Sequence, residues 1–316
     1  MTYYDKTDKY YEGNVRIPSG CAISGYFSKK GERIPGDRIV QSISYMHDRS
    51  NGLGGGFAGY GIYPEYKDQY ALHVFYNDMR ARETTEQFLN EHFDIVNLSR
   101  IPTRKHPRIT DEPLIWRYFV SPLPTKLTAS QLDEKEFVVK CVININRKID
   151  GAYVFSSGKN MGVFKAVGFP EDVGEFYRLD EYKGHCWTAH GRYPTNTPGW
   201  WGGAHPFSLL DYTVVHNGEI SSYDANRRYI ESYGYKCTLL TDTEVITYII
   251  DFLNRKKGPY ARGRGASHRP AVLGTDRAPS GSRKSAVHHA PQIVSVASRH
   301  RSVQHNSRLR RRHDGA

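Results

Sequence analysis

The sequence predicts an α+β fold built around a sizeable apolar core. The chain has 316 residues, which is enough for one large domain or two ordinary ones. Segments with strand composition and segments with helical spacing are interspersed along the first 257 residues, without an internal repeat. Of the 23 Tyr, 13 Phe and 4 Trp, only Tyr260 lies beyond residue 257. The residues that can form a core therefore lie before this point.

Regular patterns begin close to the N-terminus. Ile39, Ile43 and Met46 recur at helical spacing, which predicts a helix over residues 36–49. Short apolar runs, rich in aromatic and β-branched residues, favour strands. Between residues 21 and 92, we also predict a strand at 21–28, a glycine-rich turn at 51–61, a strand at 70–76 and a helix at 83–92.

The patterns continue in the second half of the core region. Thr241 and Glu244 form a capping box, with Thr241 as the N-cap, and predict a helix over residues 243–255. The other predicted segments are a strand at 137–144, a hairpin at 152–167 that turns at residues 158–160, a short helix at 171–179, and strands at 185–194 and 212–220 that run into turns.

The basic charge of the chain is concentrated at its C-terminal end. The formal net charge is +11, yet residues 1–257 have 32 basic and 31 acidic side chains. Residues 258–316 have 12 Lys and Arg against two acids and no sustained apolar period, which predicts a basic low-order tail. Two interpretations stay open: a disordered arm that binds nucleic acid or acidic partners, or translation out of frame. We favour the second, because the change follows an amphipathic helix without a linker.

Cysteine usage and hydropathy indicate the compartment. Cys21, Cys141, Cys186 and Cys237 are scattered without a CxxC pair, which fits neither a disulfide framework nor a zinc site. We therefore expect no metal, and a reducing, cytoplasmic location. The last three cysteines lie in apolar contexts typical of core thiols. No apolar run approaches the ~18 residues of a membrane span, and the polar N-terminus is not typical of a secretory signal.

The first cysteine lies between two glycines, in the segment PSGCAISG. One interpretation of Cys21 is a small buried hydrophobe at the start of a strand. The other is a nucleophile that becomes a chain terminus after residues 1–20 are removed. This octapeptide alone does not decide between them, so the other motifs of the chain must.

Four separated segments need a joint explanation. They are GCAISG at 20–25, AHGRYPTNTPGWWGGAHPF at 189–207, VVHNGEI at 214–220 and LLTDTEV at 239–245. Each alone has an ordinary structural explanation. Asn-Gly readily forms a turn, a single arginine commonly forms a surface ion pair, and an acid in the first turn of a helix favours the helix dipole.

Together and in this order, the four segments resemble the class II glutamine amidotransferases, which are N-terminal-nucleophile hydrolases. The resemblance covers roughly residues 15–257, with Ala22 in place of the family's usual glycine. The insertion between residues 60 and 180 and the NTPGWWGGAHPF segment are most similar to the separate amidotransferase subunit of glutamate synthase. The resemblance implies a four-layer αββα sandwich over residues 21–257. This domain would be truncated at its C-terminus, because the family's ordered structure continues where this chain becomes basic.

The resemblance also implies a role for each matched residue. Cys21 would attack the side-chain amide of glutamine, and the Asn217 side chain with the Gly218 N–H would form the oxyanion hole. Arg192 would bind the α-carboxylate of glutamine through two hydrogen bonds. Asp242 would pair with the α-ammonium group, so that a zwitterion held at both ends presents its amide at a fixed distance.

Two further residues are expected near this site. Arg49, in MHDRSNGLGGG, matches an arginine–glycine-rich segment of the family and is expected to anchor the loop beside Cys21. His216 is expected among the substrate-binding residues, although a histidine in such a place is commonly a structural hydrogen-bonding residue. Trp200 and Trp201 would either cover the glutamine pocket as a lid or pack against a partner subunit.

An N-terminal cysteine carries its own base. The α-amine, with an ordinary pKa of about 7.7–8.0, lies close to the thiol of the same residue, so no partner histidine is required. Cys21 must then be the first residue of the active chain. Residues 1–20 are therefore expected to be a leader, removed by cleavage between Gly20 and Cys21; Gly20 lacks a Cβ and would crowd an attacking thiol least.

The predicted function is hydrolysis of L-glutamine to L-glutamate and ammonia through a cysteinyl thioester. In the resembling complexes, ammonia passes to a separate synthase subunit that carries FMN and iron–sulfur clusters. No cofactor, nucleic acid or membrane is expected to bind this chain itself. Two alternatives stay open: an N-terminal-nucleophile hydrolase of another amide, and an inactive, truncated amidotransferase-like scaffold.

Overall fold

A computed structural model of the chain describes residues 20–193, 199–256 and 292–297. These residues form a mixed α/β fold, as the sequence predicts. It contains two four-stranded antiparallel sheets and two smaller sheets. Nearly all of the expected leader lies outside the described residues. Within them, no helix has both the length and the apolar character needed to cross a membrane.

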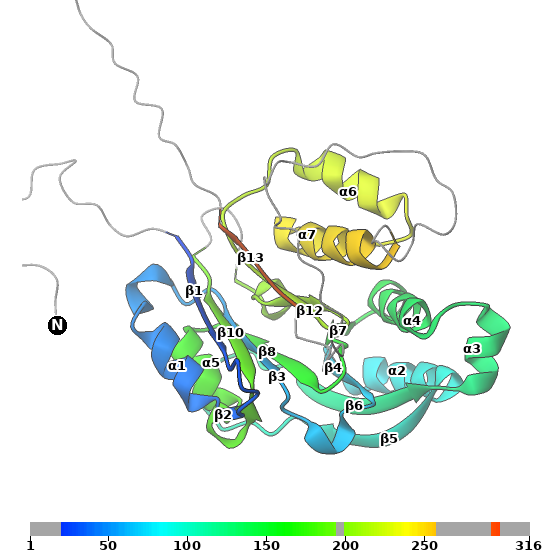
Figure 1. Cartoon of the computed structure of the whole chain (residues 1–316), viewed down its shortest axis with the longest axis horizontal. Helices are drawn as coiled ribbons and strands as arrows, with labels where there is room; N and C mark the ends of the chain where they lie inside the picture. The colour runs from blue at the N-terminus through cyan, green and yellow to red at the C-terminus, as the bar shows by residue number, and fades with distance from the viewer. Residues whose placement is uncertain (1–19, 194–198, 257–291, 298–316) are drawn as a thin grey trace, which may run out of the picture.

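The first large sheet, sheet 1, has the strand order β1-β10-β3-β8 (Figure 1). Its strands are β1 (Ala22–Phe27), β10 (Cys186–Gly191), β3 (Gly55–Tyr60) and β8 (Met161–Ala166). Two short strands, β2 (Ile34–Pro35) and β9 (Lys183–Gly184), pair separately. Because β1 and β10 are antiparallel, with Ala22 opposite Gly191, the start of β1 lies beside the end of β10.

The second large sheet, sheet 2, has the order β5-β6-β4-β7. Its strands are β5 (Phe93–Arg100), β6 (Leu114–Pro122), β4 (Tyr70–Tyr76) and β7 (Ala152–Ser156). Successive residues of β4 point to opposite faces. Ala71 and Phe75 belong to a core shared with sheet 1, whereas Leu72 and Val74 belong to a second core on the other face. Sheet 2 is therefore apolar on both faces.

A third sheet has the order β11-β12-β13, with β11 (Phe207–Leu209), β12 (Tyr212–Asn217) and β13 (Gln292–Ala297). The pairing of β12 with β13 is parallel. β13 is a strand within residues 258–316, the segment that the sequence predicts to be a basic low-order tail. The other residues of 258–316 lie outside the described part of the chain, where the low-order or out-of-frame tail stays a prediction.

Helices cover both large sheets (Figure 1). α1 and α5 share the first core with sheet 1, whereas α2, α4, α6 and α7 contribute to the second core. The helices are α1 (Asp37–Ser44), α2 (Met79–His92), α3 (Pro124–Ser130), α4 (Glu134–Lys148), α5 (Pro170–Phe176), α6 (Tyr223–Glu231) and α7 (Asp242–Asp251). Short helical turns are η1 (His47–Arg49), η2 (Pro64–Tyr66), η3 (Leu179–Glu181), η4 (Trp201–Gly203) and the π-helical η5 (Phe252–Lys256).

The strand predicted at 137–144 is wrong, because these residues lie inside α4. Phe137, Cys141 and Ile145 are buried at a spacing of four residues, which fits one face of a helix. The Asp133 side chain caps the helix by accepting the Glu136 N–H at 2.9 Å. The strand propensity of the valines is overridden by this cap and by packing against sheet 2.

The hairpin predicted at 152–167 is also wrong. The two strands exist, but β7 pairs with β4 in sheet 2 and β8 pairs with β3 in sheet 1. The turn residues bond outward: the Gly158 carbonyl accepts the Ala71 N–H and the Asn160 carbonyl accepts the Gly61 N–H. This segment therefore crosses from one sheet to the other instead of folding back on itself.

Candidate active site

Three strand ends and the start of a helix surround a cavity of about 300 Å³. β1 begins directly after Cys21, β10 ends directly before Arg192, and α7 begins at Asp242. His216 lies at the end of β12, and Gly218 follows that strand. These five residues, all predicted from the sequence, line the cavity. Arg49 and Asn217 are not part of this lining, but both bond to Cys21, as described below.

The Cys21 thiol is half-buried at one wall of the cavity. The Tyr193 N–H donates a hydrogen bond to its sulfur at 3.4 Å. Burial raises the pKa of the Cys21 thiol, while the Tyr193 N–H and the charges of Arg192 and Arg49 act in the opposite direction. Because the net shift is upward, the resting group is the neutral thiol, and nucleophilic attack requires a nearby base.

The Asn217 side chain reaches the backbone of Cys21 across the cavity wall. The Cys21 N–H donates to Asn217 Oδ1 at 3.1 Å. An amide that accepts through its oxygen keeps both N–H donors of its nitrogen for another partner. The next residue, Gly218, adds a backbone N–H at the cavity. Acyl transfer needs a thiol with hydrogen-bond donors near it, and Asn217 and Gly218 are the candidates for these donors.

The peptide bond before Cys21 is also held closely. Gly20 has a φ of +125°, and a Cβ at this position would lie 3.2 Å from Arg49 Nη2 and 3.5 Å from Asn217 Oδ1. Glycine therefore suits both the backbone conformation and the space. Arg49 Nε donates to the Cys21 carbonyl oxygen at 3.4 Å, so Arg49 fixes the backbone of Cys21 from behind the cavity.

Arg192 is almost completely buried, with 6% of its surface exposed. The backbone N–H of Arg192 donates to the Gly54 carbonyl at 2.7 Å, and its backbone carbonyl accepts a hydrogen bond from the Ser50 hydroxyl at 3.1 Å. Burial lowers the pKa of the Arg192 guanidinium, whereas Cys21 and Asp242 act to raise it. The turn predicted at 51–61 is a strand from Gly55 to Tyr60, and this strand approaches the site as backbone: a Cβ on Gly56 would lie 2.2 Å from the His205 carbonyl oxygen.

Asp242 accepts hydrogen bonds from groups on different parts of the chain. The Ile220 N–H donates to Oδ2 at 3.2 Å and the Thr243 hydroxyl donates to Oδ1 at 3.1 Å. The His216 Nδ1 lies 3.5 Å from Oδ2. Burial would raise the pKa of the Asp242 carboxyl, but His216, the Ile220 N–H and Thr243 outweigh it, so its pKa lies below the usual range. The cavity therefore contains a fixed carboxylate opposite a buried guanidinium.

A relay of hydrogen bonds lies behind Asp242. His205 Nε2 and Thr243 Oγ1 are 2.7 Å apart. Since the single hydroxyl proton of Thr243 is donated to Asp242, Thr243 must accept from His205, which places the His205 proton on Nε2. His190 stacks on His205 with ring centroids 4.2 Å apart and donates from Nε2 to the His216 carbonyl. Burial lowers the pKa of His190 to about 4 and that of His205 well below its usual value.

Sequence reasoning assigned no role to Tyr193, His205 or Thr243. All three lie inside the quoted motifs, so the signal was present, but their contacts depend on backbone placement that no local pattern contains. The two tryptophans do not line the cavity. Trp201 is buried in the first core and donates from Nε1 to the Thr110 carbonyl, and the Trp200 ring lies over Gly202 and Gly203.

Comparisons with known proteins agree with this chemistry. The sequence model of the family described as glutamine amidotransferases class-II matches residues 62–255. An uncharacterized protein of Archaeoglobus fulgidus is 56% identical over 241 residues, which make up 75% of this chain and 64% of that protein.

Two named relatives are similar over shorter stretches. A glutamine–fructose-6-phosphate aminotransferase of Sulfurisphaera tokodaii is 34% identical over 113 residues, 35% of this chain and 19% of that protein. Its counterpart in Pseudomonas putida is 42% identical over 72 residues, 22% of this chain and 12% of that protein. The chain thus spans less than two thirds of the length of each of these relatives.

Proposed function

Because this chain belongs to the class-II glutamine amidotransferases, we propose that it hydrolyses L-glutamine to L-glutamate and ammonia, with Cys21 as the nucleophile. The observation that supports this proposal is the cavity itself. It contains a thiol, a buried guanidinium and an ionised carboxylate, on Cys21, Arg192 and Asp242. Glutamine offers the matching set: an amide, an α-carboxylate and an α-ammonium group.

The proposed base is the α-amine of Cys21, which becomes free when residues 1–20 are removed. The amine takes the thiol proton as Sγ attacks the amide carbon, and returns it to the nitrogen that leaves as ammonia. The γ-glutamyl thioester is then attacked by water, which gives a proton to the same amine. The C–S bond breaks, glutamate leaves, and the amine returns this proton to the Cys21 sulfur. The Cys21 N–H bond to Asn217 Oδ1 supports this step, because the same contact would orient the amine.

The negative charge on the amide oxygen would be stabilised by the Asn217 side-chain N–H and the Gly218 backbone N–H. Losing one such donor typically lowers the rate on the order of 10²- to 10³-fold. Arg192 would hold the α-carboxylate and Asp242 the α-ammonium group, with His216 supporting Asp242. A substrate held at both ends has its amide at a set distance from the thiol, which favours glutamine over simple amides.

The acceptor of ammonia is a finer part of the proposal. We propose a glutamate synthase-type synthase subunit, which would carry FMN and iron–sulfur clusters, because the insertion at 60–180 and the segment NTPGWWGGAHPF are most similar to that amidotransferase subunit. The names of the two aminotransferase relatives favour a second candidate, a sugar phosphate acceptor.

We also propose that the fold is the αββα sandwich of N-terminal-nucleophile hydrolases. Its four layers would be α1 with α5, sheet 1, sheet 2, and α2 with α4. The proposed location is cytoplasmic.

The experiment uses the full chain, purified and incubated with L-glutamine. We expect equimolar glutamate and ammonia, a mass that corresponds to loss of residues 1–20, and a mass shift on Cys21 after treatment with an electrophilic glutamine analogue. Cys21→Ala should lose all turnover, whereas Cys237→Ala, which changes a buried thiol outside the cavity, should retain it. Turnover by protein that still begins at Met1, or by Cys21→Ala, would refute the proposed nucleophile.

A second measurement separates the possible substrates and acceptors. Simple γ-amides should compete poorly with glutamine, since they cannot satisfy Arg192 and Asp242 together. Asparagine has both α groups but should be hydrolysed poorly, because its side-chain amide is one methylene short of the thiol. A hydrolase of another amide would show the opposite preference. Ammonia transfer is then measured by adding a glutamate synthase synthase subunit with 2-oxoglutarate and a reductant, or fructose 6-phosphate. A second glutamate per glutamine consumed supports the first acceptor, and an amino sugar phosphate supports the other.

A further inference from the structure

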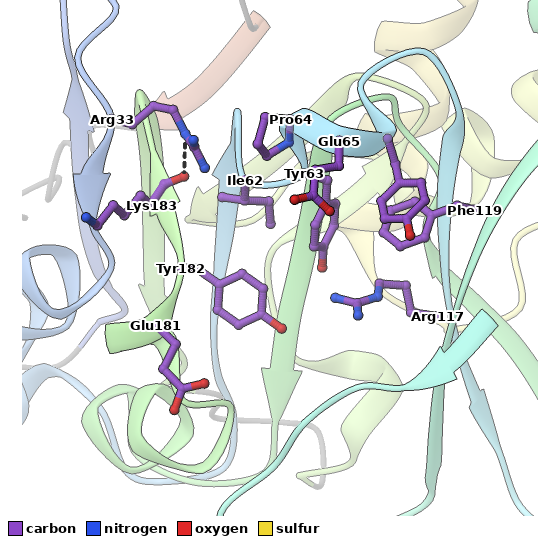
Figure 2. Close-up of a pocket in the computed structure, with 11 residues that line it drawn as sticks. Arg33, Ile62, Tyr63, Pro64, Glu65, Arg117, Phe119, Glu181, Tyr182 and Lys183 are labelled. Carbon is purple, nitrogen blue, oxygen red and sulfur yellow. Dashed lines mark hydrogen bonds between the residues drawn. The ribbon is translucent and has the colours of Figure 1, made fainter. Parts of the chain in front are cut away.

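Figure 2 shows a second cavity, of about 370 Å³. It lies at the other end of β10 from Cys21. Tyr182 and Lys183, which line it, precede β10, whereas Arg192 follows this strand. β10 has six residues, so the two cavities are separated by roughly 20 Å at ~3.3 Å per strand residue. The second cavity therefore does not belong to the site proposed for glutamine.

Aromatic rings form the floor of this cavity. Tyr63 and Phe119 are buried and meet edge to face, with ring centroids 5.0 Å apart. Tyr182 meets the other side of Tyr63 at 6.1 Å, and Tyr66 stacks on Phe119 at 4.0 Å. Such rings offer an apolar contact surface of fixed shape to a small molecule.

The Arg117 guanidinium lies above this floor. Its carbon is 5.0 Å from the Tyr63 ring centroid and 5.1 Å from that of Phe119. Nη2 donates to the Ser99 hydroxyl at 3.1 Å, and the guanidinium also interacts with the Tyr63 and Tyr182 hydroxyls. Nε is buried without a hydrogen-bond partner in the described part of the chain. Figure 2 shows the side chain reaching from β6 toward Tyr182. A buried donor with no acceptor is costly unless a ligand supplies one.

Two more cations stand at the rim. Arg33 and Lys183 are exposed, and Arg33 Nε donates to the Lys183 carbonyl at 3.1 Å (Figure 2). Neither they nor Arg117 has a carboxylate within ion-pair distance among the residues that the structure describes. Glu181, an acid of the same rim, is already paired with Arg178. Glu65, the other acid of the lining, adds one negative charge. Three cations and two acids, one of them paired with Arg178, thus surround one concave, aromatic surface, and positive charge is in excess.

We propose that this cavity binds a small organic anion with a flat ring. Its phosphate or carboxylate group would accept from Arg117, supported by Arg33 and Lys183, because guanidinium groups hold such oxyanions through paired hydrogen bonds. The ring would lie against Tyr66 and Tyr182, the half-buried rings of the lining, with Tyr63 and Phe119 buried beneath them. The volume is at the lower end of small-molecule sites, which favours a metabolite over a polymer. This inference is independent of the proposed glutaminase activity.

Ring-matched probes test this inference on the full chain. Phenyl phosphate and benzoate share a ring, but one has a phosphate group and the other a carboxylate. Calorimetric titration with each therefore shows which of the two anionic groups the cavity prefers. Inorganic phosphate lacks the ring, and benzyl alcohol lacks the charge. We expect the better of the two ring anions to bind about tenfold or more tightly than either of these controls, since ring and charge each contribute on the order of 1 kcal/mol or more.

Variants locate the binding. The double variant Arg33→Gln with Lys183→Gln changes only exposed side chains and should weaken the ring anion about tenfold, and Arg117→Gln should remove its binding. Lys67→Gln removes an exposed cation close to η2 that does not line the cavity, and should bind as the wild type does. Cys21→Ala should also bind normally. Equal binding by the double variant and the wild type, or no binding of either ring anion up to about 10 mM, would overturn the inference.

Discussion

Asp242 shows how single residues set the charge of the main cavity. Its carboxylate accepts from the Ile220 N–H and the Thr243 hydroxyl, and His216 lies beside it. Burial alone would favour the neutral acid, but these donors hold the pKa of Asp242 below its usual range. The carboxylate therefore stays ionised near neutral pH with its oxygens already oriented, so a substrate ammonium would meet a charge that needs no rearrangement.

Replacing Asp242 with Asn keeps the shape of the side chain and removes its charge. We expect the KM for L-glutamine to rise about 10- to 100-fold, as for the loss of one charge-assisted hydrogen bond, with a smaller change in kcat because Asp242 is proposed to touch the ammonium group and not the reacting amide. Steady-state kinetics measures both constants. Asp224→Asn, on the exposed surface of α6, is the matched control. An unchanged KM in Asp242→Asn would remove this residue from substrate binding.

The sequence contains enough information to find the main residues of this cavity, but not their geometry. Cys21, Arg192 and Asp242 were found because each lies in a motif, and the motifs occur in a specific order. The contact of Asn217 with the Cys21 backbone joins residues 196 positions apart. The sulfur of Cys21 accepts from the backbone of Tyr193, an interaction that any residue other than proline could make, so no side-chain pattern reveals it.

At the scale of elements, the first turn of α7 combines a cap with a positioning device. The Thr241 side chain accepts the Glu244 N–H at 3.2 Å, as the capping box predicts. The Glu244 carboxylate does not return the bond to residue 241; it accepts the Thr238 and Leu239 N–H groups instead. Between them, Thr243 links His205 to Asp242. The first turn of α7 therefore both caps the helix and orients the Asp242 carboxylate.

This arrangement separates two variants of Thr243. Thr243→Val removes the hydroxyl but keeps the branched shape, so Asp242 loses one donor and His205 loses its acceptor. We expect the KM for glutamine to rise about tenfold. Thr243→Ser keeps the hydroxyl and should restore most of the affinity, which a merely structural role of the methyl group would not allow. Equal KM values for the two variants would show that the relay does not position Asp242.

Element types were easier to predict than element partners. β4, β10 and α1 follow from local apolar patterns, because each pattern reports the burial of its own segment. The pairing of β7 with β4 and of β8 with β3 depends on strands far away in the sequence. The segment 137–144 is apolar as predicted but has the period of a helix and not of a strand, since a short apolar run without its cap fits both equally.

A buried lysine joins β8 to the turn η4. Lys165 is fully buried, its ammonium group lies 4.6 Å from the Phe207 ring centroid, and Nζ donates to the Gly202 carbonyl at 2.8 Å. Burial lowers the pKa of Lys165 to about 7, although Glu244 acts to raise it. The hydrogen bond from Lys165 therefore holds the η4 turn in place, but burying the amine costs free energy of desolvation.

The pH dependence of stability tests this cost. The unfolded chain keeps the lysine proton up to about pH 10.4, whereas the folded chain releases it near pH 7. The unfolded state thus binds more protons in this interval, so the contribution of Lys165 to the free energy of unfolding rises with pH, on the order of 1 kcal/mol per unit. Urea unfolding of wild type and Lys165→Met at pH 7 and pH 9.5 should show the wild type gaining relative to the variant. A constant difference would contradict the lowered pKa.

At the scale of the whole molecule, the two large sheets are joined through buried histidine. His73 on β4 donates from Nδ1 to the Val163 carbonyl of β8 at 2.8 Å and accepts the Tyr63 hydroxyl at Nε2. Burial lowers the pKa of His73 to about 3, and that of His190, in sheet 1, to about 4. The junction between the two large sheets therefore requires a neutral His73 ring, and the contact of sheet 1 with β12 requires a neutral His190 ring.

Acid should then weaken the whole fold. In the unfolded chain a histidine takes up a proton near pH 6.5, but folded His73 does so only near pH 3 and folded His190 near pH 4. Between these values the unfolded state binds more protons, so the free energy of unfolding falls as the pH is lowered from about 6.5 to 4, by up to about 1.4 kcal/mol per unit for each histidine. His73→Gln can keep the bond to Val163 without titrating, and its loss of stability across this interval should be smaller than in the wild type. His92→Gln, on the half-buried surface of α2, is the control. If the wild type and His73→Gln lose stability in parallel, the junction does not depend on the neutral ring.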